Sequence, residues 1–258
     1  MNLQLEGKRA LVTGSTAGIG LAIATALARE GARVIVNGRT QERVDAAIRA
    51  SGAADGIAAD VGTAAGTNAI VARFSEVDIL VNNAATFGPK PFEEIPDEEW
   101  SRFFEVNVMS GVRLSRRYLP EMKQQNWGRI VFISSESGLQ IPVEMIHYGM
   151  TKTAQLAISR GLAETTTGTA VTVNAVLPGP TESEGAGTFI QKMADERGMG
   201  RAEFDREFFE KLRPSSILKR FATTEEVASV VAFVCSPLAS AINGAAIRVD
   251  GGVVRSIA

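Results

Sequence analysis

The sequence predicts an α/β fold, in which a doubly wound parallel sheet of about seven strands carries helices on both faces. Three observations support this prediction: short apolar runs recur along the chain, helical patterns separate them, and no internal repeat or low-complexity tract interrupts the alternation. Runs that are apolar almost throughout are typical of strands covered on both faces. Strands that alternate with helices are joined by crossover connections, which favour a parallel sheet.

The expected strands are short runs of mainly apolar composition. They are residues 9–14, 33–38, 55–60, 78–83, 129–134, 171–178 and 245–250. After the first run, apolar residues at helical spacing form one stripe, made by Ile19, Ala22, Ile23, Ala26 and Leu27 and followed by Gly31 as a C-terminal signal. Before the last run, Thr223 and Glu226 have the spacing of a capping box.

Composition and charge exclude several classes of protein. Apolar residues make up 45% and charged residues 22% of the chain, as in ordinary globular proteins. A net charge of −2, without a basic stripe, gives no reason to expect nucleic-acid binding. The chain has a single His and no metal-ligand spacing, so we expect no metal site.

The single cysteine and the uncharged segments bear on the cellular setting. Cys235 cannot form an internal disulfide and lies in an apolar run, so we expect a buried side chain in a cytoplasmic protein. The N-terminus lacks a basic flank followed by an apolar signal core. The uncharged window 227–247 contains Pro237, so we expect a buried helix followed by a turn and no membrane span.

One region departs from the alternation. Residues 182–216 show no strand signal, but "AGTFIQKMADERGMG" and "RAEFDREFFEKLR" both have helical patterns with apolar faces. Inserted helices fit such a length better than a structureless loop does. We therefore expect a single domain, residues 1–258, with a helical insertion at about 182–216. The two small helices pack on the domain, and they could also form a mobile lid over a substrate.

A glycine-rich turn, "TGSTAGIG", follows the first expected strand and opens a helix. Gly14, Gly18 and Gly20 allow a tight turn and let a pyrophosphate approach the N-terminal amides of that helix. The spacing differs from G-x-G-x-x-G, but the position after a first strand favours nucleotide binding. Ligands of doubly wound sheets bind at the carboxyl ends of the strands, which is where this turn lies.

The stretch "HYGMTK" holds a candidate acid–base pair. On a helix Tyr148 and Lys152 share a face, whereas His147 points roughly 100° away, as a packing or capping residue would. An ammonium about 5 Å from a phenol lowers the phenol pKa of about 10 by roughly two units, although burial opposes this. The pair therefore predicts general acid–base catalysis by Tyr148, with a solvent-facing Tyr beside a Lys as the simpler alternative.

Taken together, the motifs resemble the short-chain dehydrogenase/reductase family, in its compact form with one Rossmann-like domain. They are "TGSTAGIG" (13–20), "NNAA" (82–85), Asn107 in "EVNVMSG", "ISSESG" (133–138), "YGMTK" (148–152), "LPGPT" (177–181) and "VDGG" (249–252). They follow the family's order along essentially the whole chain, and the ordered set is specific although each motif alone is weak. The chain departs from the family at Ala85, where Gly is usual, and in the short stretch 61–76.

The resemblance implies four catalytic residues: Asn107, Ser135, Tyr148 and Lys152. Tyr148 matches the general acid and base, and Ser135 matches the serine that hydrogen-bonds the substrate carbonyl or hydroxyl. Lys152 matches the lysine that lowers the tyrosine pKa and binds the nicotinamide ribose. Asn107 matches the asparagine that holds a water in a proton relay behind the lysine.

The resemblance also implies the residues that contact the cofactor. In the glycine-rich turn they are Gly14, Ser15, Thr16, Ala17, Gly18, Ile19 and Gly20. Asp60 and Val61 match the pair beside the adenine, although Asp60 could instead cap a helix. Asn83 and Ala84 match residues near the adenosine ribose. Tyr148, Lys152, Pro178, Gly179 and Thr181 match the nicotinamide side.

One position bears on the choice of cofactor. NAD-dependent Rossmann enzymes place an acid at the end of the second strand, where this chain has Gly38. Arg39 follows, and a guanidinium can grip a 2′-phosphate with two charge-assisted hydrogen bonds. An Arg that only begins a solvated helix is the simpler interpretation. The missing acid favours NADP(H), with NAD(H) possible.

The resemblance implies an NADP(H)-dependent oxidoreductase that interconverts a secondary alcohol and a ketone. A catalytically silent NADP-sensing regulator on the same scaffold is the alternative, and a structural oligomer subunit is a third. The partners expected are a small carbonyl or alcohol substrate and further copies of the chain, as a homotetramer or homodimer. We expect the substrate pocket to be lined by residues after Ser135, namely Leu139, Ile141 and Val143 with Glu144 as a polar contact, and by the segment 182–215.

Overall fold

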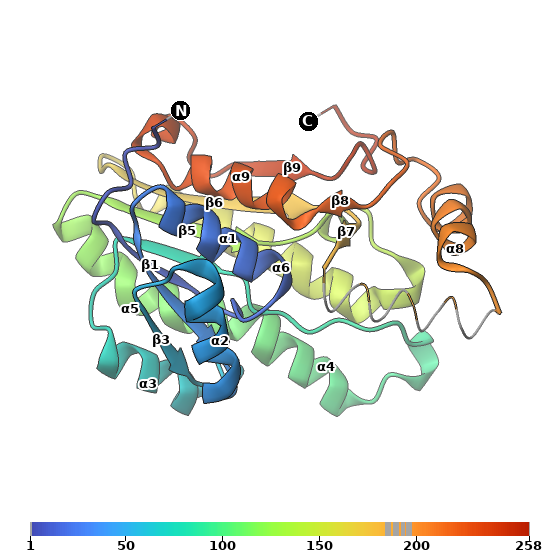
Figure 1. The fold of residues 1–258 in the computed structure, drawn as a ribbon, viewed down its shortest axis with the longest axis horizontal. Coiled ribbons are helices and arrows are strands. Elements are labelled where there is room, and N and C mark those ends of the chain that lie inside the picture. Colours follow the sequence, from blue (N-terminus) through green and yellow to red (C-terminus); the bar gives the residue numbers. More distant parts are fainter. Residues whose placement is uncertain (1, 184–186, 188–190, 192–193, 195–197, 258) are drawn as a thin grey trace.

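The computed structural model describes residues 2–183, 187, 191, 194 and 198–257. Its central element is a parallel seven-stranded sheet with strand order β3-β2-β1-β4-β5-β6-β9, shown in Figure 1. The strands are β1 (Arg9–Val12), β2 (Arg33–Gly38), β3 (Asp55–Ala58), β4 (Ile79–Asn82), β5 (Gly128–Ile133), β6 (Val171–Pro178) and β9 (Ala246–Val249). Each expected strand is confirmed, with ends that differ by at most two residues.

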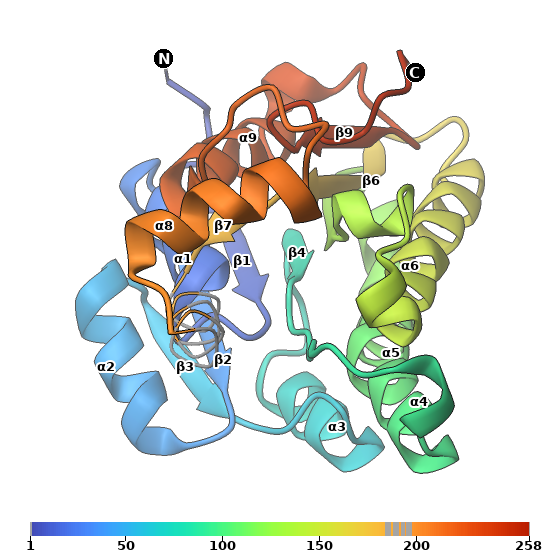
Figure 2. The same ribbon diagram turned by 90° about the vertical axis from the view of Figure 1, so that its right-hand side faces the viewer.

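Helices cover both faces of the sheet, as Figure 2 shows. One face carries α1 (Gly18–Arg29), α2 (Gln41–Ser51) and α9 (Thr224–Val234), and the other carries α3 (Ala64–Arg73), α5 (Ser110–Gln124) and α6 (Ile146–Glu164). Alternate residues of each strand feed the two cores: Ala10 and Val12 of β1 pack under α1, while Leu11 packs on the opposite side. The Rossmann-like doubly wound fold is therefore confirmed.

Local signals explain where several helices begin and end. α1 is followed by Gly31 with φ +86°, the left-handed conformation for which a glycine is best suited. α4 (Asp97–Phe104) has Asp97, Glu98 and Glu99 in its first turn, where acidic side chains are favoured. Between α4 and α5 the chain passes through a π-helical turn, Glu105–Met109, which contains Asn107. Such turns are rare and are frequently found at functional sites.

The segment after β6 departs from the main sheet, and its two ends come back together beside the sheet. Two short parallel strands, β7 (Thr181–Glu182) and β8 (Ala222–Thr223), pair with each other outside the main sheet. They were not predicted, because two residues are too few to show a periodicity. Between them lie α8 (Arg201–Glu207) and a π-helical turn, Phe208–Leu212, beyond the carboxyl ends of the strands and on the right in Figure 1.

Aromatic side chains hold this segment together. The ring centroid of Phe221 lies 5.0 Å from that of Phe208 and 5.0 Å from that of Phe209, while Phe204 is fully buried in the same cluster. The second helix expected in the insertion is therefore confirmed as α8 and the turn that continues it. The first expected helix falls mainly on residues outside those that the structure describes.

The C-terminal apolar run forms a core helix. Cys235 follows α9 and is fully buried, which raises the pKa of its thiol to about 12. The chain then turns at Pro237–Ala239, as expected. Throughout the described part of the chain, every helix is too short or too polar to span a bilayer.

We expect the capping box of α9 to contribute measurably to stability. Thr223 Oγ1 accepts a hydrogen bond from Glu226 N at 3.2 Å, and Glu226 Oε2 accepts one from Thr223 N at 2.8 Å. Thr223→Ala should lower the free energy of unfolding by about 1 kcal/mol, measured by chemical denaturation. Thr224→Ala is the control, because the Thr224 hydroxyl bonds only the neighbouring Glu225 carboxylate. Equal losses in both variants would contradict the capping role.

Candidate active site

A cavity of 360 Å³ opens at the carboxyl ends of the strands, beside the switch point between β1 and β4. It gathers residues from the first turn of α1, the ends of β4, β5 and β6, the start of α6 and the segment after α8. Among the expected site residues it is lined by Ile19, Asn83, Ser135, Tyr148, Lys152, Pro178, Gly179 and Thr181. Asn107 is not part of its wall.

Tyr148 and Lys152 lie one turn apart on the same face of α6. Lys152 Nζ is 5.5 Å from the centroid of the Tyr148 ring. The amine is almost fully buried and donates hydrogen bonds to Ile133 O at 2.8 Å and to Gln155 Oε1 at 3.2 Å. The convergence expected from helical spacing is therefore present, and a carbonyl at the end of β5 anchors the lysine.

The sequence predicts that the Lys152 ammonium lowers the pKa of the Tyr148 phenol, and this prediction is wrong for the protein chain by itself. Burial raises the pKa of Tyr148, the Glu136 carboxylate raises it further, and a hydrogen bond to Ser135 opposes them. Burial also lowers the pKa of Lys152 to about 7. The reason is that removal from water penalises the charged form of both groups, so near neutral pH the amine is only partly charged. At that pH Tyr148 is a neutral phenol, which is the form that donates a proton.

Three neighbouring serines follow β5, and their hydroxyls have different partners. Ser134 Oγ donates to Lys152 O at 2.8 Å, and Ser137 Oγ donates to Glu136 Oε2 at 2.7 Å. Ser135 Oγ accepts from Ser137 N at 3.1 Å and is the hydroxyl that meets the phenol of Tyr148. Ser134 and Ser137 therefore have other partners, and Ser135 is the serine that we expect to act beside Tyr148.

Asn107 lies behind Lys152 and is joined to it through one side chain. Its amide accepts from Thr86 N at 2.7 Å and donates to Thr86 O and Thr151 Oγ1, both at 2.9 Å. Its main-chain carbonyl accepts from Gln155 Nε2 at 2.6 Å, while Gln155 Oε1 accepts from Lys152. This orientation of the Gln155 amide is required, because an ammonium only donates and a carbonyl only accepts.

Sequence reasoning missed Gln155. Its position three residues after Lys152 on the same helix face was the available signal. The side chain is 1% exposed, so both of its polar atoms depend on these internal partners.

His147 takes no part in the cavity. Its ring is fully buried, with its centroid 4.1 Å from that of Phe103 on α4, and burial lowers its pKa. Nε2 is 3.8 Å from Glu99 Oε1, beyond hydrogen-bond distance. The side chain therefore packs between α4 and α6, as the helical spacing indicates.

The glycine-rich turn after β1 is compact and fits a dinucleotide. A Cβ on Gly20 would lie 2.5 Å from Gly14 O and 2.4 Å from Asn83 Nδ2, so a larger residue would force the turn apart. Gly14 has φ +60°, and a Cβ on this residue would lie 2.9 Å from Ala84 Cα. No side chain caps α1, and its first turn holds no acid. Uncapped amides at a helix N-terminus favour an anion such as a pyrophosphate.

Two polar side chains brace this turn from within. Ser15 is fully buried; its N–H donates to Asn37 O, and its hydroxyl donates to Val12 O at 2.7 Å. Asn83 Nδ2 donates to Thr13 O at 2.9 Å and Gly14 O at 3.0 Å. Both residues therefore hold the shape of the turn. Thr16, Ala17 and Gly18 continue the turn into α1.

The interpretation of Asp60 as a possible helix cap is wrong. The cap of α3 is Thr63, whose hydroxyl accepts from Gly66 N at 3.0 Å. Asp60 Oδ1 instead accepts from Gly62 N at 2.9 Å in the preceding turn, which leaves the carboxylate exposed beside the buried Val61. The glycine at 66 allows this, because a Cβ there would lie 1.9 Å from Asp60 O.

The end of β2 has no room for the acid of NAD-dependent enzymes. A Cβ on Gly38 would lie 2.3 Å from Thr16 Cγ2 in the glycine-rich turn. Arg39 is exposed at the end of the strand. The cation is therefore accessible, and an acid at position 38 would require the Thr16 side chain to move.

The residues after β6 form the opposite wall of the cavity. Pro178 ends the strand, and a Cβ on Gly179 would lie 2.6 Å from Asp250 O. Thr181 Oγ1 donates to Gly179 O at 2.9 Å and is 7% exposed. This close packing places the Thr181 region against the cavity that holds Tyr148.

The expected apolar lining after Ser135 is only partly correct. Leu139, Ile141 and Val143 are 46%, 42% and 83% exposed and do not line the cavity, because the loop that carries them turns outward. Phe208 and Leu212 line the cavity from within the expected segment 182–215, and the rest of the apolar wall comes from Phe87, Pro89, Met145 and Phe221. Glu144 does line the cavity, as do Glu136 and Arg213, which sequence reasoning did not single out.

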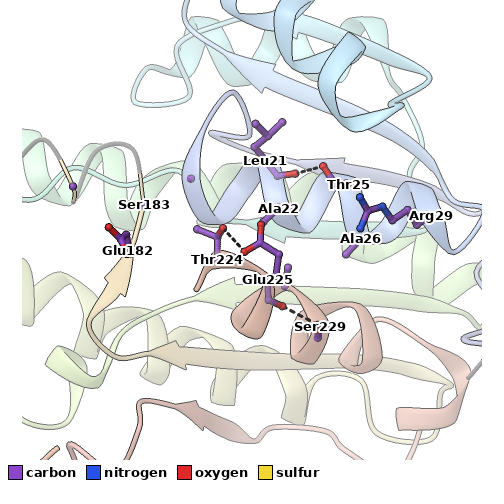
Figure 3. A pocket seen from close by; sticks show the side chains of 13 residues that line it. Leu21, Ala22, Thr25, Ala26, Arg29, Glu182, Ser183, Thr224, Glu225 and Ser229 are labelled. Atoms are coloured by element: carbon purple, nitrogen blue, oxygen red, sulfur yellow. Dashed lines mark hydrogen bonds between the residues drawn. The ribbon is translucent and has the colours of Figure 1, made fainter. Parts of the chain in front are cut away.

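A separate groove of 590 Å³ lies between α1 and α9, as Figure 3 shows. Its walls carry Leu21, Ala22 and Arg29 from α1, and Glu225 and Ser229 from α9. None of the four expected catalytic residues lines it. The chemistry expected from the sequence therefore belongs to the cavity at the strand ends.

We expect the Gln155 bridge to be needed for stability. Gln155→Leu leaves a carbonyl of the π-helical turn and an N–H of Lys152 without partners in the interior. The free energy of unfolding should fall by about 1–3 kcal/mol in chemical denaturation. Gln124→Leu, at an exposed position of α5, should change it by less than about 0.5 kcal/mol. Similar values for the two variants would show that the bridge contributes little.

Comparisons with known proteins agree with this site. Residues 14–254 match the family model described as enoyl-(acyl carrier protein) reductase. The chain is 51% identical to the uncharacterised oxidoreductase YvaG of Bacillus subtilis, with both chains fully covered. It is 34% identical to the 3-oxoacyl-[acyl-carrier-protein] reductase FabG of Aquifex aeolicus, over 98% of this chain and 100% of that protein.

A solved structure resembles the whole chain. It is the L-sorbose reductase of Gluconobacter frateurii complexed with NADPH and L-sorbose, with a TM-score of 0.93, 32% identity and full coverage of both chains. The protein is thus an oxidoreductase of the class that acts on CH–OH groups with a nicotinamide cofactor. The chain belongs to the short-chain dehydrogenase/reductase family.

Proposed function

We propose that the protein is an NADP(H)-dependent oxidoreductase that interconverts a secondary alcohol and a ketone, with Tyr148 as the general acid and base. The observation that carries this proposal is that Ser135, Tyr148 and Lys152 meet in one cavity beside the uncapped N-terminus of α1. A silent nucleotide sensor would have no need for a buried Tyr–Lys pair beside a serine hydroxyl, so the alternative has no support from this site.

The nicotinamide would supply or accept the hydride at the substrate carbon. Tyr148 then gives its phenolic proton to the carbonyl oxygen in reduction, or takes the hydroxyl proton in oxidation. Ser135, which lines the same cavity as this phenol, orients that oxygen. Lys152 lies behind the ring, and its positive charge, when present, stabilises the phenolate that is left after proton transfer.

The chain's own residues support NADP(H) over NAD(H). The exposed Arg39 can pair with a 2′-phosphate, and Gly38 cannot be exchanged for an acid without displacing Thr16. The L-sorbose reductase that resembles this chain was solved with NADPH. Gly14–Gly20, Asp60, Val61, Asn83 and Ala84 are the further contacts that we propose for the cofactor, with Thr181 on the nicotinamide side.

We also propose a single domain, with residues 182–216 as a lid over the substrate. The support is that β7 and β8 bring the two ends of this segment together, while Phe208, Leu212 and Arg213 line the cavity. Asn107 as part of a proton relay, the homo-oligomer and the cytoplasmic location stay predictions.

Tyr148→Phe should abolish turnover while NADPH still binds, because only the acid–base hydroxyl is lost. We expect kcat to fall by about 10²–10⁴-fold in a carbonyl reduction assay, with NADPH affinity unchanged in a fluorescence titration. His147→Ala is the matched control, and single-turnover kinetics should find its chemical step largely intact. A variant with Phe at 148 that keeps more than a small fraction of the rate would refute the assignment.

Arg39→Ala should reduce discrimination between the two cofactors. Loss of a charge-assisted contact should lower kcat/KM for NADPH by roughly ten- to a hundredfold and leave that for NADH nearly unchanged. Arg33→Ala, exposed at the other end of β2, is the control and should alter neither value. A wild-type preference for NADH would contradict this prediction, as would an Arg39→Ala variant that still prefers NADPH as strongly. Gly38→Asp is unsuitable for the test, because it would displace Thr16.

A further inference from the structure

A buried carboxylate directly follows the proposed catalytic serine. Glu136 is 4% exposed, and its Oε2 accepts hydrogen bonds from Ser135 Oγ, Ser137 N and Ser137 Oγ. A serine hydroxyl has one proton and two lone pairs. The proton of Ser135 is directed at Glu136, and a lone pair of the same hydroxyl accepts from Ser137 N at 3.1 Å.

The same carboxylate is paired with a cation from a distant part of the chain. Glu136 Oε1 accepts from Arg213 Nε at 3.2 Å, and Arg213 is 9% exposed. Arg213 Nη1 also donates to Glu144 Oε1 at 3.2 Å and to Leu212 O at 2.9 Å. The three charged side chains therefore form one cluster on the cavity wall, where the segment after α8 meets the loops before α6.

Arg213 is held rigidly at the end of its own segment. Its N–H donates to Phe208 O at 2.8 Å, and its guanidinium lies 5.8 Å from the centroid of the Phe208 ring. Phe208 belongs to the aromatic cluster with Phe209 and Phe221. The position of the cation is thus determined by the packing of residues 201–221.

Stability alone gives little reason for such a pair. A buried ion pair contributes little compared with an apolar pair of the same size, whereas removal of one partner is costly. Glu136 and Arg213 could be a packed apolar contact without loss to the fold. The contact of Glu136 with Ser135 provides a reason for a charged pair at this place.

Resting on the proposed function, we propose that Glu136 and Arg213 are positioning residues for the reaction. Glu136 accepts a hydrogen bond from Ser135 and so fixes that side chain beside Tyr148, and Arg213 holds Glu136 in place. The catalytic serine is therefore set in its working orientation only when residues 201–213 pack over the cavity.

This arrangement has a consequence for Tyr148. The nearby carboxylate charge of Glu136 favours the neutral form of the phenol and raises the pKa of Tyr148. The charged groups around Tyr148, in the described part of the chain, are Glu136 and Lys152, with Arg213 and Glu144 behind Glu136. Removal of the Glu136 charge should therefore lower the pKa of Tyr148.

The first experiment uses Glu136→Gln, which keeps the size of the side chain and removes its charge. We expect kcat for carbonyl reduction to fall about tenfold, with KM nearly unchanged. The basic limb of the pH profile should move to lower pH by roughly one unit, because the acid form of Tyr148 is lost earlier. Arg160→Met is the control. It removes an exposed ion pair on α6, the helix that carries Tyr148, and should leave the rate and the pH profile unchanged.

The second experiment needs no catalysis. The chain has two tyrosines, so in a Tyr118→Phe background the phenolate absorbance reports Tyr148 alone. Its onset should appear at lower pH after Glu136→Gln, with circular dichroism to establish that the protein is still folded. An unchanged onset would overturn the inference even if the enzyme is active. A shifted onset in a protein that turns over no carbonyl compound would support the contact between Glu136 and Tyr148 and count against the proposed function alone.

The third experiment tests the role of Arg213. Arg213→Met leaves Glu136 buried without a cation, so kcat should fall more deeply than in Glu136→Gln, with KM nearly unchanged. The double variant Glu136→Gln/Arg213→Met should recover part of that loss, since no unpaired charge remains. Additive losses, or a rise in KM with kcat and pH profile unchanged, would overturn the inference and make Arg213 a substrate-binding residue.

Discussion

The buried amine of Lys152 organises the candidate site. An ammonium away from water needs hydrogen-bond acceptors, and here they come from Ile133 O at the end of β5 and from Gln155 on α6. Gln155 in turn bonds the carbonyl of Asn107, so the π-helical turn is tied to the same point. Tyr148 lies one turn before the lysine and is placed by the same contacts. The requirement to satisfy one buried amine thus holds β5, α6 and the turn between α4 and α5 in register.

The nucleotide side of the site depends on close backbone approach. Gly14 and Gly20 let the turn after β1 pack against Asn83 and Ala84 at the end of β4, across the switch point of the sheet. Side chains at either glycine would separate these segments. Because the turn is braced from within by Ser15 and Asn83, the N-terminal amides of α1 stay uncapped and face the region where an anion binds.

The substrate side is governed by a different kind of constraint. Apolar residues such as Phe87, Met145 and Phe208 make most of its wall, and the charged cluster of Glu136, Glu144 and Arg213 interrupts it. Charges in such surroundings are stable only when paired. The pairing joins the loop of the proposed catalytic serine to a segment 77 residues later in the chain, so the shape of the pocket and the orientation of Ser135 depend on each other.

The sequence by itself determined the sheet and most of its helices, and it also singled out the residues that we propose for catalysis. Apolar runs in alternation with helical patterns predict strands and crossovers directly, and the spacing of Tyr148 and Lys152 places them on one face, because these are local properties of the backbone. Only the tertiary structure decided the pairing of Glu136 with Arg213, the bridge through Gln155, and the outward turn of Leu139, Ile141 and Val143. It also decided that burial and the Glu136 carboxylate together raise the pKa of Tyr148. Contacts across many residues and the loss of hydration arise only when distant segments are packed together, and neither leaves a periodic signal in the chain.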